Sequence, residues 1–515
     1  MPVSEFNMCI LDTHPYHAFP SLYTLNSTMS LEKSGVFSVQ RNIPLYGQGI
    51  LIAVIDTGIE YQHKAFLNAD GTSRILSIWD QTIKNGSPPD GFTFGAEYSK
   101  RLLNYAIRQP NPYSVVPTTD NNGHGTMLAG IAAGNRNRLE DFSGAAPNSE
   151  LVIVKLKPAK RYNRRIFSVP ENIECYQESD IMLGVEYVRS IAVKMNKPLV
   201  ICIGLGTSQG NHNGNGTLCL LVNDISLLPR MAVSVAAGNE GNNRRHFRGE
   251  VTEPDYTRQF HLNISEQDKM FSFEIWQELP YRLAVSIISP SGEATNLIYP
   301  RLYECRKFDS ALESYTIYVN NIIFEEETGN QLILIRFENA QSGIWTIQVE
   351  SLEKSNSTFN AWLPSGNLIS TDTYFLEPDP YITVTAPGNS ENTITVTAYN
   401  QYDNNIIIDS SRGYTLSSTV KPDLAAPGYL LTCPTLQNTY GSATGTGAAA
   451  AHTAGILAMI LEWAVLKGNY TTITGRDIGR LLIRGASRGT NLEYPNPIWG
   501  YGALDVYGLF TQLIP

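Results

Sequence analysis

Four short runs of apolar, mostly β-branched residues alternate with helical patterns in the first half of the chain. The runs occupy residues 49–55, 151–154, 199–203 and 231–235. Between the second and the third, residues 179–195 carry apolar side chains at helical spacing. Unbroken apolar strands are typical of a parallel sheet that is buried on both faces. We therefore predict an α/β fold in which helices flank a parallel sheet.

The pattern changes between residues 248 and 385. Short runs with period-two alternation, such as 271–276 and 343–349, are separated by turn residues, and no helical pattern is evident. This predicts an all-β sandwich, and because α/β character resumes afterwards, we expect the sandwich to be inserted. The predicted organisation is an N-terminal extension at 1–48, a first α/β part at 49–247, an inserted sandwich at 248–385 and a second α/β part at 386–515.

Charge and cysteine usage narrow the function classes. The formal net charge of -10 disfavours nonspecific binding to nucleic acid, so no nucleic-acid partner is expected. Two basic clusters, at 155–165 and 244–245, are expected in solvated loops. The six cysteines lie far apart without a C-x-x-C spacing, which predicts free thiols in a reducing compartment.

Targeting signals are not evident in the sequence. The N-terminal residues lack a basic start followed by an apolar stretch, and no run of about 18 apolar residues is found. We therefore expect neither a signal peptide nor a membrane span, and a cytoplasmic location unless other features indicate a compartment.

Two polar motifs in the first half carry candidate chemistry. Asp56 ends the first apolar run and precedes Thr57-Gly58. A carboxylate at a buried strand end can orient a histidine and stabilise its protonated form, although the same motif also suits a simple turn. His124 lies between Gly123 and Gly125 at the start of a small-residue helical pattern. Its ring is free to face a cleft, and the alternative is an exposed loop histidine.

Two further motifs follow. Asn239 comes shortly after the apolar run 231–235, where its amide can donate to a developing oxyanion or merely close a turn. Gly447 lies at the start of the small-residue helical pattern 446–463. A helix N-terminus stabilises negative charge and can position a nucleophile, but glycine has no side chain that can attack. A second helical pattern covers 474–485, with Thr474 as its N-cap.

These motifs, in this order and with these flanks, resemble the subtilisin-like serine proteases, whose catalytic order is Asp, His, Ser. The segments 204–207, 410–413 and 421–428 also resemble segments of that family. The resemblance implies that Asp56, His124 and Asn239 hold the catalytic and oxyanion positions, and that Gly447 replaces the serine nucleophile. It further implies that Gly204, Leu205 and Gly206 form the substrate cleft, and that His452 is structural.

A narrower resemblance is carried by residues 31–36, 78–82, 176–184 and 499–502. They are similar to the clostridial Csp germination subtilases, which insert a jelly roll between the Asn and Ser motifs. That family has active members and inactive pseudoproteases, called CspA and CspC, and Gly447 places the chain with the inactive ones. The resemblance implies a regulator of bacterial spore germination, located in the spore. Such a protein would bind or control an active Csp protease or relay a signal from a small-molecule germinant.

Two alternatives stay open. One is an active serine endopeptidase with a nonstandard nucleophile, for which Ser442 and Thr446 are nearest in sequence to Gly447. The other is a structural assembly protein with a vestigial cleft. No cofactor is expected, and no metal site, because the acidic residues are scattered and no calcium-type loop is evident.

Overall fold

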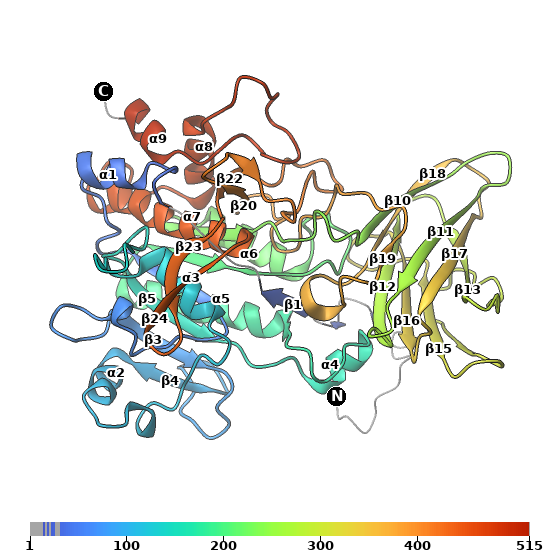
Figure 1. Cartoon of the computed structure of the whole chain (residues 1–515), viewed down its shortest axis with the longest axis horizontal. Coiled ribbons are helices and arrows are strands. Elements are labelled where there is room, and N and C mark those ends of the chain that lie inside the picture. Colours follow the sequence, from blue (N-terminus) through green and yellow to red (C-terminus); the bar gives the residue numbers. More distant parts are fainter. Residues whose placement is uncertain (1–13, 16–17, 20–21, 26–30, 514–515) are drawn as a thin grey trace.

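The computed structural model describes residues 14–15, 18–19, 22–25 and 31–513 of the chain (Figure 1). Within them, nine strands form one sheet in the order β21-β20-β9-β7-β2-β5-β3-β4, with β22 paired to β20. The central pairs are parallel, and β4 and β21 are antiparallel at the two ends. The α/β fold is therefore confirmed. The strands are β2 Leu51–Asp56, β3 Ile75–Asp80, β4 Ala96–Ser99, β5 Glu150–Lys155, β7 Leu199–Ile203, β9 Met231–Ala236, β20 Ile394–Asn400, β21 Asn405–Ile406 and β22 Leu424–Pro427.

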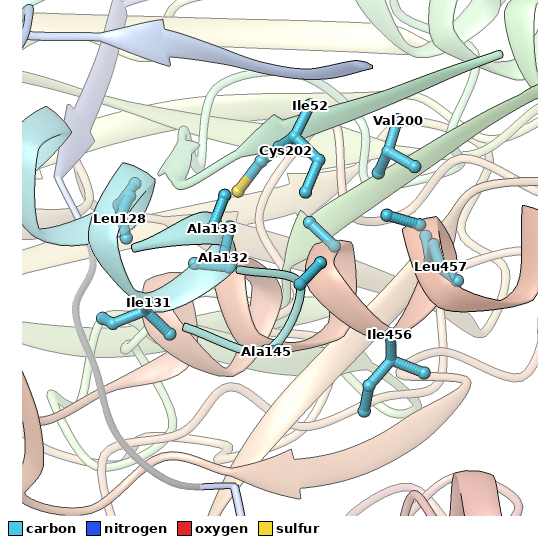
Figure 2. Close-up of a cluster of buried hydrophobic side chains, with 14 of the residues drawn as sticks. Ile52, Leu128, Ile131, Ala132, Ala133, Ala145, Val200, Cys202, Ile456 and Leu457 are labelled. Carbon is cyan, nitrogen blue, oxygen red and sulfur yellow. The ribbon is translucent and has the colours of Figure 1, made fainter. Parts of the chain in front are cut away.

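Helices cover both faces of this sheet because its strands alternate their side chains between two cores. Ile52 and Val54 of β2 belong to one core, together with α1, α3, α7, α8 and α9. Leu51 and Ile55 belong to the other, together with α5 and α6. Figure 2 shows part of the first core, where Ile52 lies among side chains of α3 and α7. The helices are α1 Val36–Asn42, α2 Lys100–Ile107, α3 His124–Ala133, α4 Arg161–Ile166, α5 Glu178–Met195, α6 Thr217–Leu227, α7 Thr446–Leu461, α8 Gly475–Gly485 and α9 Val506–Leu513.

Helix α7 is buried along its whole length. Together with the π-helical turn Glu462–Leu466 it is, by length and composition alone, long and apolar enough to cross a membrane, although it is not an uninterrupted apolar run. All its residues from Thr446 to Leu461 are buried, and it contacts α3, β7, β9 and β20. This apolar character is explained by its place in the core, where small residues let neighbouring backbones approach.

The segment that follows β9 forms two antiparallel sheets at one end of the molecule (Figure 1). They share an aromatic core that includes Phe260, Phe273 and Trp345, so the expected all-β insertion is observed as a sandwich. One sheet has the order β10-β18-β12-β16-β15-β14 and the other β13-β17-β11-β19. The strands are β10 His246–Val251, β11 Thr257–Ile264, β12 Met270–Gln277, β13 Leu283–Ile288, β14 Cys305–Asp309, β15 Thr316–Ile322, β16 Gln331–Glu338, β17 Gly343–Ser351, β18 Ser357–Trp362 and β19 Tyr374–Phe375.

The cysteine prediction was wrong at one position. Cys175, Cys202, Cys219 and Cys433 are free and buried, as predicted. Cys305 is disulfide-bonded, and Cys9 lies outside the described residues. Sequence spacing does not report proximity in space, so the argument for a reducing compartment fails at Cys305.

Candidate functional site

Asp56 and His124 meet at the carboxyl edge of the sheet. Asp56 is the last residue of β2, and His124 is the first residue of α3. The Nδ1 atom of His124 lies 2.8 Å from Oδ1 of Asp56, and the backbone N–H of Thr57 donates to the same oxygen at 2.8 Å. Both side chains are almost fully buried. The carboxylate therefore fixes the ring with Nδ1 inward, which is the orientation that an imidazole needs to exchange protons through Nε2.

Asp120 holds the start of α3 in place, and the sequence analysis missed it. Its Oδ1 accepts from the backbone N–H of Gly123 at 2.8 Å, and its Oδ2 accepts from the N–H and the hydroxyl of Thr126 at 3.0 and 2.6 Å. Gly123, the N-cap, has a φ of 91°, a left-handed conformation that glycine adopts without strain. A carboxylate three residues before this cap is the available signal for such a role.

Asn239 lies beside the first turn of α7. Its Oδ1 accepts from both the backbone N–H and the hydroxyl of Thr446, each at 3.1 Å. Because a backbone N–H can only donate, these contacts identify the oxygen of the Asn239 amide and turn its NH₂ group away from Thr446. The NH₂ group is then the part of this amide that can donate to an oxyanion. Gly447, which follows Thr446, is buried in the first turn of α7.

The two pairs lie at one edge of the sheet. Helices α3 and α7 contact each other, and both contact β2. The structure therefore pairs Asp56 with His124, places Asn239 beside Thr446 and Gly447, and carries the two pairs on helices that contact each other. Ligands of parallel sheets bind at the carboxyl edge, where Asp56 lies. No hydrogen bond joins His124 to the hydroxyl of Ser442 or Thr446 in the described part of the chain. The Thr446 hydroxyl instead accepts from the N–H of Gly238 at 3.1 Å.

The predicted cleft strand is paired with a segment of the same chain. Gly204 is buried and precedes β8 Leu205–Gly206. The backbone of β1 Leu22–Leu25 runs antiparallel to β8, with Thr24 opposite Gly206. On its other side β1 pairs with β6 Tyr176–Gln177. A peptide that bound between β6 and β8 would therefore have to displace β1.

Position 206 requires glycine because the side chain of Thr385 lies directly against it. A Cβ atom there would lie 2.3 Å from Oγ1 of Thr385. The Thr385 hydroxyl donates to the backbone oxygen of Ala237 at 3.2 Å, and the N–H of Ala386 donates to the backbone oxygen of Thr207 at 2.9 Å. The Thr385 segment therefore bridges the cleft strand and the loop that carries Asn239.

The loop after Asn239 is tied to the sandwich by a buried ion pair. Nη1 of Arg245 lies 3.1 Å from Oε2 of Glu240, and each side chain is less than 5% exposed. Arg245 also donates to the backbone oxygens of Gly366 and Ile369. The expectation of solvated basic loops was wrong here and at Arg164, which is likewise buried. Sequence reasoning missed both because their acceptors are distant in sequence or are backbone oxygens.

Among the described residues, no group of three or more His, Cys, Asp or Glu side chains could hold a metal ion. His452 is fully buried, and its Nε2 lies 2.6 Å from the hydroxyl of Ser34. Burial lowers the pKa of His452 to about 3, so the ring is neutral at physiological pH. In the described part of the chain His452 forms no hydrogen bond with Asp56, and it is buried in the middle of α7.

Comparisons with known proteins support the resemblance to subtilisin-like proteases that the sequence motifs indicated. The model of the Subtilase family, Peptidase_S8, matches residues 47–265 and 377–502. Thermitase of Thermoactinomyces vulgaris is 24% identical over 196 residues, which span 38% of this chain and 50% of that protein. Subtilisin-like protease SBT1.9 of Arabidopsis thaliana is 32% identical over 149 residues, which span 26% of this chain and 19% of that protein. The chain thus covers half or less of these two relatives.

One solved structure is similar over almost its whole length. The Clostridium perfringens CspB protease superposes with a TM-score of 0.82 and 30% sequence identity, and the match covers 94% of this chain and 98% of that one. The similarity extends through the sandwich, because residues 47–265 and 377–502 alone would cover much less.

Proposed function

Because the chain belongs to the subtilase family and its fold is that of a Csp protease, we propose that it is a catalytically inactive subtilase that regulates bacterial spore germination. In this role it controls or assembles with an active Csp-type protease, or relays the signal of a small-molecule germinant, in the spore. The observation that carries the proposal is Gly447, a glycine where the family motif has its serine, on a helix that contacts the helix of His124.

The chemistry at Gly447 supports inactivity. Acyl transfer by a serine protease requires a hydroxyl oxygen that attacks the substrate and a histidine that takes its proton. At residue 447 there is no such oxygen. In subtilisin, removing the catalytic serine lowers kcat about 2 × 10⁶-fold.

An active enzyme with another nucleophile has less support. The hydroxyl of Thr446 is buried and engaged with Gly238 and Asn239. Ser442 lies on β24 Thr439–Ala443 and is exposed, with no hydrogen bond to His124. Neither hydroxyl has a base within the described hydrogen-bond network, so neither is activated as nucleophilic catalysis requires.

The pairing of β1 bears on how the protein would act on a partner. Both edge strands of the cleft, β6 and β8, already have β1 as an antiparallel neighbour. Regulation through a surface outside the cleft is therefore simpler than capture of a peptide within it. This favours a scaffolding or signalling role. It is also compatible with the alternative of a structural assembly protein whose cleft has no function.

The role in germination is tested in the spore-forming organism that carries the gene. We expect spores that lack the protein to germinate poorly, and the wild-type gene to restore germination. The His124→Ala variant, checked for normal abundance in spores, separates the functions: an inactive regulator predicts full rescue, and an active peptidase predicts none. Normal germination of the deletion strain would overturn the germination role.

A further inference from the structure

A cavity of about 1130 Å³ opens on the face of the molecule away from the candidate site. Residues that precede or begin the parallel strands line it: Gly49 before β2, Arg74 before β3, Glu150 at the start of β5 and Lys197 before β7. It therefore lies at the amino edge of the sheet, whereas Asp56 lies at the carboxyl edge. A six-residue strand separates the two edges by about 20 Å. The neighbouring elements α1, α2, β3 and β5 are remote from the sandwich (Figure 1).

The charged residues that line the cavity are nearly all cations. Its charged lining residues are Lys64, Arg74, Lys100, Arg136, Arg138 and Lys197, against a single carboxylate, Glu150. Glu150 is already neutralised, because it pairs with Lys197 and lies 3.7 Å from Nζ of Lys100. Other carboxylates lie near the cavity without lining it: Asp70 accepts from Thr72, and Glu32 and Asp141 line an adjoining hollow that shares Arg136 and Arg138 with the cavity.

Several of these cations have no carboxylate in contact. Arg74 is buried and donates to the backbone oxygens of Ala133 and Ser149 and to the side-chain oxygen of Asn135. Lys64, Arg136 and Arg138 are exposed and form no ion pair in the described part of the chain. Burial of Arg74 places a fixed positive charge beneath the exposed ones. A concave surface of one sign concentrates counter-charged ligands.

This surface contrasts with the rest of the protein. The chain carries 48 acidic and 38 basic residues, yet six of the basic residues and one acidic residue line this cavity. We propose that the cavity binds an acidic peptide segment of a partner protein. Arginine and lysine on separate loops suit carboxylates spaced along an extended chain. The hollow is open to solvent and has a volume of about 1130 Å³, so it admits an extended chain segment.

The proposal is tested with fluorescein-labelled hexaglutamate, measured by fluorescence anisotropy with the full chain at low and physiological salt. We expect saturable binding that weakens as salt rises, because exposed charges are screened. Charge reversal in Arg136→Glu/Arg138→Glu should weaken binding at least 10-fold. A matched control, Lys84→Glu/Lys269→Glu, changes net charge equally at exposed lysines outside the cavity and should bind as the wild type does.

Three other outcomes would overturn the proposal. Equal loss in both double variants would mean general charge attraction and would overturn the proposal. So would an absence of binding, or equally tight binding of citrate or of a single-stranded oligodeoxynucleotide with the same dependence on Arg136 and Arg138. Neither Gly447 nor His124 takes part, so failure here leaves the proposed function untouched.

Discussion

His124 and Asp56 share one buried hydrogen bond of 2.8 Å although no nucleophile stands at residue 447. Neighbouring residues of the same two elements also contact each other. The N–H of Gly125 donates to the hydroxyl of Thr57 at 2.9 Å, so the start of α3 is tied to the end of β2 by adjacent contacts. Retention of the pair therefore has a structural basis that is independent of proton transfer.

The ion pair between Glu240 and Arg245 should be important for stability. The Glu240→Ala variant leaves a buried guanidinium without its carboxylate, and breaking such a pair costs about 3–5 kcal/mol. We expect a clear loss in the free energy of unfolding, measured by denaturant titration. Glu250→Ala, at an exposed position on β10, is the control and should change stability by less than about 0.5 kcal/mol. Similar values for the two variants would contradict the assignment.

Arg74 should be needed for the folded amino edge of the sheet. Its guanidinium bridges the end of α3 and the residue before β5 through the backbone oxygens of Ala133 and Ser149. The Arg74→Met variant leaves these buried acceptors unpaired, at about 1–3 kcal/mol each. Thermal unfolding should show a lower Tm than in the wild type. The exposed Arg101→Met variant should keep the wild-type Tm, and an unchanged Tm in both would refute the bridging role.

Acid should destabilise the protein through His212. Burial, with a smaller effect of nearby His246, lowers the pKa of His212 to about 4. The unfolded chain binds this proton near pH 6.5 and the folded protein only near pH 4, so stability falls as the pH drops through that window. The shift corresponds to about 3 kcal/mol. The difference in Tm between pH 7 and pH 4.5 should be smaller in His212→Gln, and an equal difference would exclude this source.

The pairing of β1 with the cleft predicts protection from hydrogen exchange. Backbone amides around Leu205–Gly206 and Tyr176–Gln177 should exchange slowly in the wild type, because β1 lies between these two strands. Proline substitutions at Tyr23 and Thr24 remove two N–H donors from β1 and should speed exchange in both segments. Exchange in β7 Leu199–Ile203 should not change. Equal rates in both proteins at the cleft segments would show that β1 does not cover them.

The sequence predicted the layered elements well, for physical reasons. The run 199–203 became β7 with the same bounds, because every side chain in it is apolar and buried. Thr474 caps α8 in a capping box with Asp477, a local arrangement that sequence spacing reveals. Asp56, His124 and Asn239 could be singled out from the sequence because each lies at one end of, or shortly after, an element that the apolar pattern indicates.

The features that the sequence did not predict depend on long-range contacts. The four residues of β1 pair with strands about 150 and 180 residues away, and their composition does not indicate a partner. Arg245 was expected in solvent, yet it meets Glu240 and three backbone oxygens that only the fold brings together. Cys305 was expected to be free because the cysteines lie far apart in the sequence, yet it is disulfide-bonded.

The proposed inactivity depends most directly on Gly447, and labelling with a fluorophosphonate probe tests it. The wild-type protein should not be labelled, because the probe needs an activated hydroxyl. The Gly447→Ser variant should be labelled at residue 447, the additional His124→Ala change should abolish that label, and Gly447→Ala should behave as the wild type does. Labelling of the wild-type protein at any hydroxyl that depends on His124 would contradict the claim that this subtilase is inactive.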